Sequence, residues 1–137
     1  MDAREIRLDK IKITFLENDL CHFHFTNTEE EAEKADIVEL HDTIKEHMTV
    51  DKCYMIISLD SGATMTQEAR DYAASEAFDE IAAADAIIRA DYSHEMAANF
   101  FIRFNRPHRP VRIFPDMDHA IAWINGLRDG QDMDNNT

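Results

Sequence analysis

Glycine is scarce in this chain, with only three among its 137 residues. Loops that cradle phosphates need several closely spaced glycines, so a Walker loop or a dinucleotide-binding Gly-x-Gly-x-x-Gly loop is excluded. The sequence also contains no Gly-x-Ser-x-Gly nucleophile elbow and no His-Glu-x-x-His metal motif. We therefore predict a protein that is not an enzyme and that uses no cofactor.

Cysteine and long hydrophobic runs are also sparse. Cys21 and Cys53 form no Cys-x-x-Cys pair, and we expect both thiols to be buried in strands as small hydrophobes. No apolar run approaches the roughly 18 residues needed to span a bilayer. The first residues lack the apolar run of a signal peptide. These absences predict a cytoplasmic protein without a transmembrane segment.

Basic residues are outnumbered: 14 Lys and Arg stand against 28 Asp and Glu, for a formal net charge of −14. A field of this sign repels phosphate, which excludes a nucleic-acid partner. The length is that of one domain, and 45% hydrophobic residues suffice for a core. We predict a single domain over residues 1–127, followed by a polar, frayed tail at 128–137.

What the chain does contain is a regular succession of strand and helix patterns. Alternating residues at 11–16 and 21–25 predict an antiparallel hairpin, and the nearly continuous apolar run at 53–59 predicts a central strand. Further strands are expected at 86–90 and 111–114.

Helices are expected between these strands. Thr28 and Glu31 form a capping box for a helix that ends near Met48, and a second helix begins near Gln67. Ser93 is expected to cap a Phe-rich helix that stops before Pro107, and Asp116 or Asp118 to cap the last helix. The resulting order, β-β-α-β-α-β-α-β-α, favours an α/β fold with a mixed, largely parallel sheet.

Several strings carry a family resemblance. They are Thr66-Gln67-Glu68-Ala69-Arg70, Ala84-Asp85-Ala86-Ile87-Ile88, Asn99-Phe100-Phe101-Ile102-Arg103-Phe104-Asn105-Arg106-Pro107, and Arg112-Ile113-Phe114 followed by Ala120-Ile121-Ala122-Trp123. With the element order, they resemble the SpoIIAA-like (STAS/SEC14-like) family of small uncharacterised bacterial proteins. The resemblance implies a SpoIIAA-like sheet of four or five strands with helices mainly on one face.

The resemblance also draws attention to the loop after strand 53–59. Anti-sigma factor antagonists of the STAS group dock to a kinase and are phosphorylated on a serine at the start of the following helix. The nearest positions here are Ser61, Thr64 and Thr66, although the Asp-Ser-Ser-Gly-type string of that branch is missing. Ligands and partners bind beyond the carboxyl ends of strands in open α/β sheets. Alternatively, Thr64 is a helix cap, with Gln67 three residues on.

Two histidines on one expected strand form a second candidate site. His22 and His24 are two residues apart, so both side chains project from the same face of the sheet, away from Cys21, Phe23 and Phe25. Two imidazoles can hold zinc when a third ligand is available. The spacing indicates no third ligand, so the pair serves equally well as exposed or interface residues.

The Phe-rich helix supplies the remaining candidates. Arg103 and Arg106 form an anion site with Ser93, or they pair with surface carboxylates, as we expect of Arg70. The aromatic side chains line a small-molecule or lipid pocket, or they pack the helix on the sheet; these are Phe100, Phe101 and Phe104.

The favoured function is a non-enzymatic STAS-like protein-interaction or regulatory module. Its docking surface is the sheet edge and the helix after strand 53–59, its partner is another protein, and a homodimer is a candidate assembly. The alternative is a small-molecule or lipid carrier, which requires a cavity of at least a few hundred Å³ beneath the Phe-rich helix. A metal-dependent role at His22 and His24 is the third hypothesis.

Overall fold

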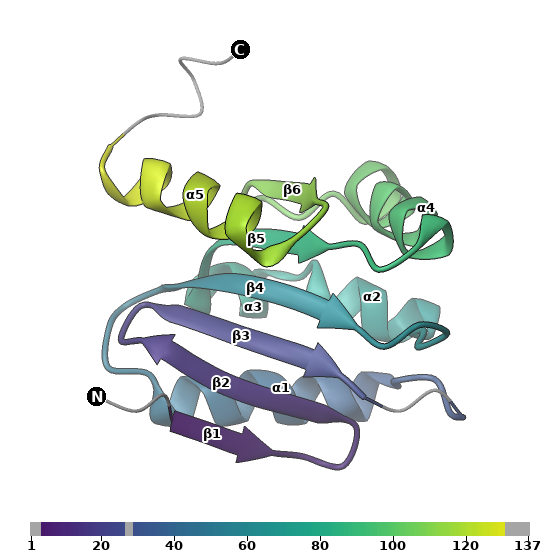
Figure 1. The fold of residues 1–137 in the computed structure, drawn as a ribbon. Coiled ribbons are helices and arrows are strands. Elements are labelled where there is room, and N and C mark those ends of the chain that lie inside the picture. Colours follow the sequence, from purple (N-terminus) through teal and green to yellow (C-terminus); the bar gives the residue numbers. More distant parts are fainter. Residues whose placement is uncertain (1–3, 27–28, 131–137) are drawn as a thin grey trace.

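The computed structural model describes residues 4–26 and 29–130. Its six strands form one sheet in chain order, with β1, β2 and β3 antiparallel and β3 to β6 parallel (Figure 1). The strands are β1 (Arg4–Arg7), β2 (Ile11–Glu17), β3 (Leu20–Phe25), β4 (Cys53–Leu59), β5 (Ala82–Ile88) and β6 (Val111–Phe114). The sheet is therefore mixed and mostly parallel, as the sequence predicted.

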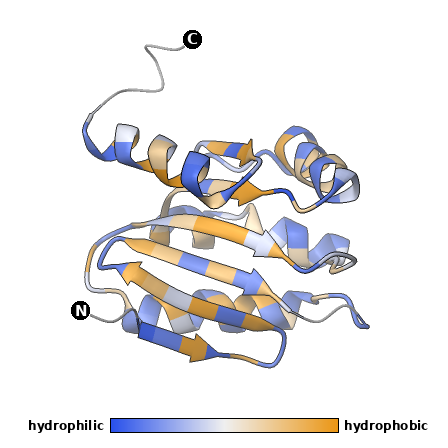
Figure 2. Cartoon of the chain, in the orientation of Figure 1, coloured by the Kyte–Doolittle hydropathy of each residue, from blue (hydrophilic) through white to orange (hydrophobic). Residues whose placement is uncertain are grey.

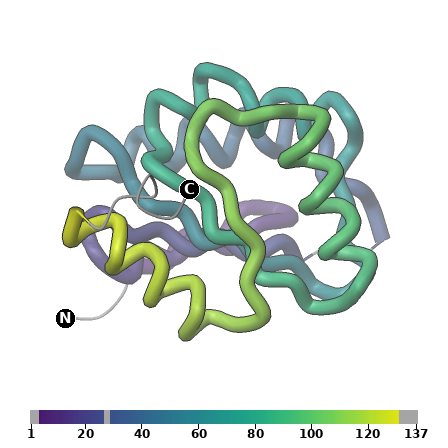
Figure 3. Tube along the Cα trace, turned by 90° about the horizontal axis from the view of Figure 1, so that it is seen from above, coloured from purple at the N-terminus to yellow at the C-terminus, as the bar shows by residue number. Residues whose placement is uncertain are grey.

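Helices cover both faces of this sheet unequally. In Figures 1 and 3, α1, α2 and α3 lie behind the sheet and α4 lies beside them, whereas α5 alone lies in front. The helices are α1 (Lys34–His47), α2 (Gln67–Ala73), α3 (Glu76–Ile81), α4 (Tyr92–Phe100) with its π-helical continuation η1 (Phe101–Asn105), and α5 (Met117–Arg128). Within the described ranges, no helix combines the length and apolar character needed to cross a membrane.

Strand alternation divides the interior into two cores. Ile11, Ile13 and Phe15 of β2 are buried toward α1 and alternate with more polar residues, as the banding of β2 shows (Figure 2). The smaller core, on the other face, joins strand residues such as Ile56 to Ile124 of α5. Because α5 lies mainly over β5 and β6, with Leu20 at the start of β3 also in this core, His22 and His24 of β3 stay partly exposed on this face.

The sequence predicted most helices and strands and several of their ends. The hairpin of β2 and β3, the central strand β4, the edge strand β6 and the cap of α5 by Asp116 are confirmed. Helix α1 ends at His47 with Met48 as its C-cap, and the Phe-rich helix ends at Asn105, followed by Arg106, whose φ of 51° is left-handed just before Pro107.

The expected start of the first helix was wrong. Helix α1 begins at Lys34 with Glu33 as its cap, and Thr28 lies outside the described residues. Glu31 precedes the helix, next to an isolated bridge between Ala32 and Met65.

Other differences concern the sheet and its connections. The sheet has six strands instead of the expected four or five, since it includes β1, which was not predicted. Strand β5 begins at Ala82 rather than at residue 86. The helical segment after β4 is split into α2 and α3 by Ser75. Helix α5 includes Arg128, the first residue of the expected tail, and its guanidinium pairs with Asp19. Residues 131–137 of that tail lie outside the described part.

Candidate functional site

A cavity of about 300 Å³ lies between the sheet and helices α1, α2 and α4. Small side chains on the helices and on the loop before α2 leave this space open, namely Ala63, Ala73, Ala97 and Ala98. Its walls are otherwise mostly large and apolar, and they include Phe23, Phe25, Leu40, Ile57, Ile87 and Phe101. The chain thus encloses a space of the size that the carrier hypothesis requires, beneath the Phe-rich helix.

His94, in the first turn of α4, lines this cavity and is only 6% exposed. The Ala90 N–H lies 3.4 Å from its Nδ1, which therefore acts as an acceptor. A neutral imidazole with an accepting Nδ1 carries its proton on Nε2. This buried Nε2 has no hydrogen-bond partner. His94 therefore presents an unused donor in an apolar space.

Arg70 of α2 lines the same cavity. One guanidinium nitrogen donates to the Met65 carbonyl at 2.6 Å, and the guanidinium carbon lies 5.6 Å from the centre of the Phe100 ring. Its buried Nε has no hydrogen-bond partner. Arg70 takes part in none of the ion pairs found among residues 4–26 and 29–130, so the expected surface pairing does not occur there.

Arg109 and Asp85 lie at another part of the cavity wall and are fully engaged with each other. Arg109 donates two hydrogen bonds to the Asp85 carboxylate, at 2.9 and 2.8 Å. It also donates to Asp79 and to the Ala73 carbonyl. This pair ties β5 to α2 and α3, and it leaves no guanidinium nitrogen unpartnered.

The loop between β4 and α2 forms part of the cavity wall and is held in place by short polar contacts. Ser61 donates to Asp91 at 3.0 Å, and Thr64, which lines the cavity, donates to Glu31 at 3.1 Å. Thr66 rather than Thr64 caps α2, because its hydroxyl accepts the Ala69 N–H at 3.1 Å.

Asp91 joins this loop to α4. Its carboxylate caps the helix by accepting the His94 backbone N–H, and the Ser93 and Ser61 hydroxyls also donate to it. These hydrogen bonds, the backbone one first, lower the pKa of Asp91 to about 2. Asp91 thus takes the capping role that we expected for Ser93, which lines the cavity next to it.

The Phe-rich helix has two apolar sides. Phe101 is buried against the cavity, whereas Phe100 and Phe104 are 48% and 66% exposed and stack with their ring centres 4.5 Å apart. Arg103 lies over the Phe104 ring, and Arg106 donates to the Arg103 carbonyl. Neither arginine lines the cavity with Ser93, so the structure does not bring these three residues together there.

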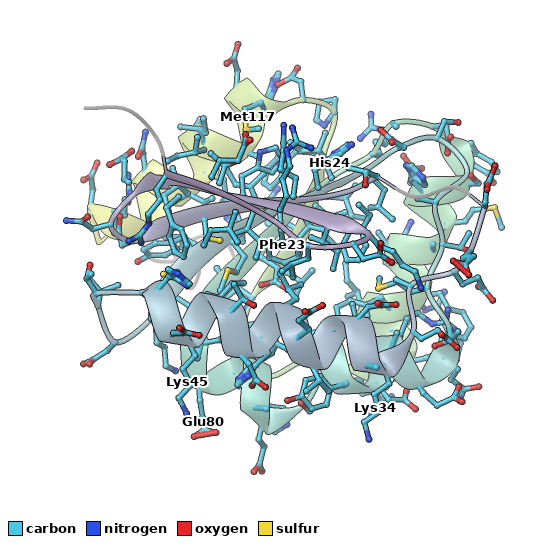
Figure 4. All side chains as sticks on the ribbon, turned by 90° about the horizontal axis from the view of Figure 1, so that it is seen from below. Phe23, His24, Lys34, Lys45, Glu80 and Met117 are labelled. Carbon is cyan, nitrogen blue, oxygen red and sulfur yellow. The ribbon has the colours of Figure 1, made fainter. Side chains whose placement is uncertain are left out.

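His22 and His24 project from the face opposite α1, as expected, and Figure 4 shows Phe23 and His24 on opposite sides of the strand. Ser58 Oγ lies 2.7 Å from His22 Nε2 and 2.6 Å from His24 Nδ1, and His24 Nε2 lies 2.7 Å from Asp60. Because a carboxylate only accepts, His24 donates to Asp60 and accepts from Ser58, whose oxygen accepts from His22.

This network has its own electrostatics. Burial first, then His24 and Lys12, lower the pKa of His22 to about 4. Asp, His and Ser also form hydrolase triads, but here the Ser58 oxygen accepts a hydrogen bond from His22, which makes it a poorer nucleophile. No group of three or more His, Cys, Asp or Glu side chains among the described residues is arranged to hold a metal ion.

Sequence reasoning missed two of the cavity's polar residues, His94 and Arg109. His94 only follows the expected cap Ser93, and Arg109 stands in a short loop between two prolines. The available signal was the run of small residues at Ala97 and Ala98 beside an aromatic face, which leaves room in a core.

Comparisons with known proteins place the chain in a structural context. A family model described as a domain of unknown function, DUF7793, matches residues 14–128. A crystal structure of an uncharacterised protein from the DUF3478 family with a SpoIIAA-like fold, from Shewanella loihica PV-4, is similar with a TM-score of 0.54. It is 15% identical, and the match covers 89% of this chain and 91% of that one. No curated protein matches. The SpoIIAA-like resemblance and fold are therefore confirmed.

Proposed function

The chain belongs to the DUF7793 family, whose function is unknown, and we propose that it is a non-enzymatic module that binds a small, largely apolar molecule in the cavity beneath α4. The observation that carries this proposal is the unpartnered His94 Nε2 in an apolar cavity of about 300 Å³. A ligand of that volume is compact, since ligand sites range from roughly 300 to 1,000 Å³.

The energetic argument concerns the buried donor. Leaving a buried N–H without a partner costs about 1–3 kcal/mol, so proteins keep such groups where they serve a purpose. A ligand oxygen that accepts from His94 recovers this free energy on binding. The apolar walls contribute the remaining driving force by removing ligand surface from water.

Binding can be tested with N-phenyl-1-naphthylamine, a neutral probe whose fluorescence increases in apolar surroundings. We expect saturable enhancement with the native protein and its loss in the Ala98→Leu variant, since Ala98 is buried at the cavity wall. Ala122→Leu, the same change at an exposed position of α5, is the matched control and should leave binding unchanged. No enhancement with the folded native protein would refute the proposal.

A protein-interaction role is the second candidate, because α4 exposes a row of large apolar side chains. These are Tyr92, Met96, Phe100 and Phe104, 74%, 56%, 48% and 66% exposed, and we call them the α4 stripe. They recur every four residues along α4 and η1, on the side away from the buried His94, Ala98 and Phe101.

A second copy of the chain is the partner that the charges around this stripe fit. Asp91 and Glu95 lie at its amino-terminal end, and Arg103 and Arg106 lie at its carboxyl-terminal end. In a two-fold antiparallel pairing, the acidic end of one stripe meets the basic end of the other. The helix dipoles are also antiparallel in that arrangement.

Sedimentation velocity of the native protein tests this pairing. We expect a dimer that becomes monomeric in the Phe100→Ser/Phe104→Ser variant, because the change removes the stacked rings at the proposed contact. Leu16→Ser changes an exposed apolar residue on β2, 38% exposed and outside the stripe, and should leave the dimer intact. A native protein that stays monomeric at high micromolar concentration would exclude the pairing.

A further inference from the structure

The buried polar atoms of the cavity that lack a hydrogen-bond partner are all donors. Among the described residues, three buried side-chain N or O atoms lack a hydrogen-bond partner: Arg70 Nε, His94 Nε2 and Asn105 Oδ1. Only Arg70 and His94 line the cavity, and both of their atoms are donors. A ligand that satisfies this wall must bring oxygen acceptors rather than donors.

The charged side chains of the cavity wall indicate which ligand charge is favoured. The Arg70 guanidinium is always protonated, and it faces the cavity wall without an ion-pair partner in the described part of the chain. The buried acid of the same wall, Asp85, is already held by Arg109 through two hydrogen bonds. The cavity wall therefore offers one free positive charge at Arg70, while its remaining carboxylate, Glu31, is exposed at the surface and accepts a hydrogen bond from Thr64.

We infer that the ligand is a compact amphipathic carboxylic acid, whose carboxylate accepts from Arg70 and His94 and whose apolar body fills the space between the aromatic and aliphatic walls. This inference rests on the proposed function, because it specifies the chemistry of the molecule bound in the same cavity. The carboxylate supplies two oxygens, which matches two separate donors.

The position of the donors agrees with an amphipathic ligand. Arg70 and His94 come from α2 and α4, and they lie at the part of the wall that also holds two exposed residues, Thr64 of the β4–α2 loop and Ser93 of α4. The large apolar residues of β3 and β4, including Phe23 and Ile57, form the sheet side of the cavity. A head group at the helical wall thus leaves the hydrocarbon portion against the sheet.

Displacement of N-phenyl-1-naphthylamine by three ten-carbon molecules tests the inference. We expect decanoate to displace the probe at a concentration roughly tenfold or more below decan-1-ol, the size of effect of one charge-assisted hydrogen bond. Decylamine should be the weakest, because its ammonium group brings donors and a positive charge beside Arg70. This comparison uses the native protein alone and needs no variant to fold.

Variants then assign the preference to the residues. Arg70→Met should remove most of the advantage of decanoate over decan-1-ol while the neutral probe still binds, and Arg70→Lys should retain part of it. Arg7→Met, at an exposed arginine of β1, is the control and should change nothing. His94→Phe, which removes the donor but keeps the ring volume, should weaken decanoate severalfold.

The outcomes separate the two proposals. If the neutral probe binds but decanoate is no better than decan-1-ol, the carboxylate inference is overturned and the binding function stands. An advantage of decanoate that persists in Arg70→Met overturns the inference as well. If neither the probe nor any ten-carbon molecule binds to the folded protein, the binding function itself fails.

Discussion

Arg109 holds Asp85 in a bidentate ion pair inside the protein, with both side chains less than 5% exposed. The same guanidinium donates to Asp79 and to the carbonyl of Ala73. One side chain from the loop before β6 therefore connects β5, α2 and α3 at the cavity wall. The pair fixes the position of α2, which carries Arg70.

Breaking this pair should destabilise the protein strongly. Arg109→Met leaves two carboxylates, those of Asp85 and Asp79, without their cation, and removal of one partner of a buried pair typically costs about 3–5 kcal/mol. Urea unfolding followed by circular dichroism measures the loss. The exposed pair of Arg89 and Glu95, 3.2 Å apart, is the control, and Arg89→Met should cost about 1 kcal/mol or less. Equal losses for the two variants would contradict the buried role of Arg109.

The cap of α2 gives a smaller and more local prediction. Thr66→Ala removes the hydroxyl that accepts the Ala69 N–H and should lower the free energy of unfolding by about 1 kcal/mol. Thr66→Asp should restore most of it, because aspartate caps helices as well. Thr64→Ala serves as the comparison and should cost less, since Thr64 is exposed and, within the described ranges, its hydroxyl bonds only to the exposed Glu31. If Thr64→Ala lowered the free energy of unfolding more than Thr66→Ala, Thr64 would be the residue that caps α2.

Local patterns explain how much of this fold could be predicted from the sequence. The strands β2 and β4 follow from alternation and from a continuous apolar run, because each pattern reports which faces are buried. Strand β1 was not predicted because three of its four residues are charged, around Ile6, and it lies at the edge of the sheet. The start of β5 was predicted too late because Ala82, Ala83 and Ala84 favour helices locally. Their burial in the sheet overrides that preference.

The candidate site was less predictable for a physical reason. The cavity is built from residues of β3, β4, β5, α1, α2 and α4, and its volume depends on how their side chains fail to fill the space between them. No local pattern reports that difference. The polarity of the site depends on which donors are left over, and Arg70 and Arg109 look alike in sequence although only Arg109 has every nitrogen engaged.

The two cysteines should be inert in the native protein. Cys21 and Cys53 are both buried, and burial raises the pKa of the Cys53 thiol to about 11 and that of Cys21 further in the same direction. Because the thiolate is the reactive species, we expect no rapid reaction with Ellman's reagent in buffer at neutral pH. Both thiols should react at once in denaturing urea. A fast phase of one thiol per chain in the native state would show that one strand end opens readily.

His22 makes the stability of the protein depend on pH. Its pKa in the fold is about 4, below the value of about 6.5 for an exposed histidine, because burial and the neighbouring His24 and Lys12 disfavour the charged ring. Between these two values the unfolded chain binds a proton that the folded chain does not. The free energy of unfolding should therefore fall as the pH is lowered from about 6.5 to about 4.

The variant His22→Gln separates this contribution from other titrating groups. Glutamine keeps a donor for the Ser58 oxygen, which lies 2.7 Å from His22 Nε2, but it has no proton to gain in this range. Urea midpoints measured at pH 7 and pH 5 should differ less for this variant than for the native protein. Lys45→Gln, at an exposed position of α1, is the control and should keep the native difference. If His22→Gln keeps the full native difference, the fold does not keep the His22 ring neutral in this range, and other titrating groups cause the pH dependence.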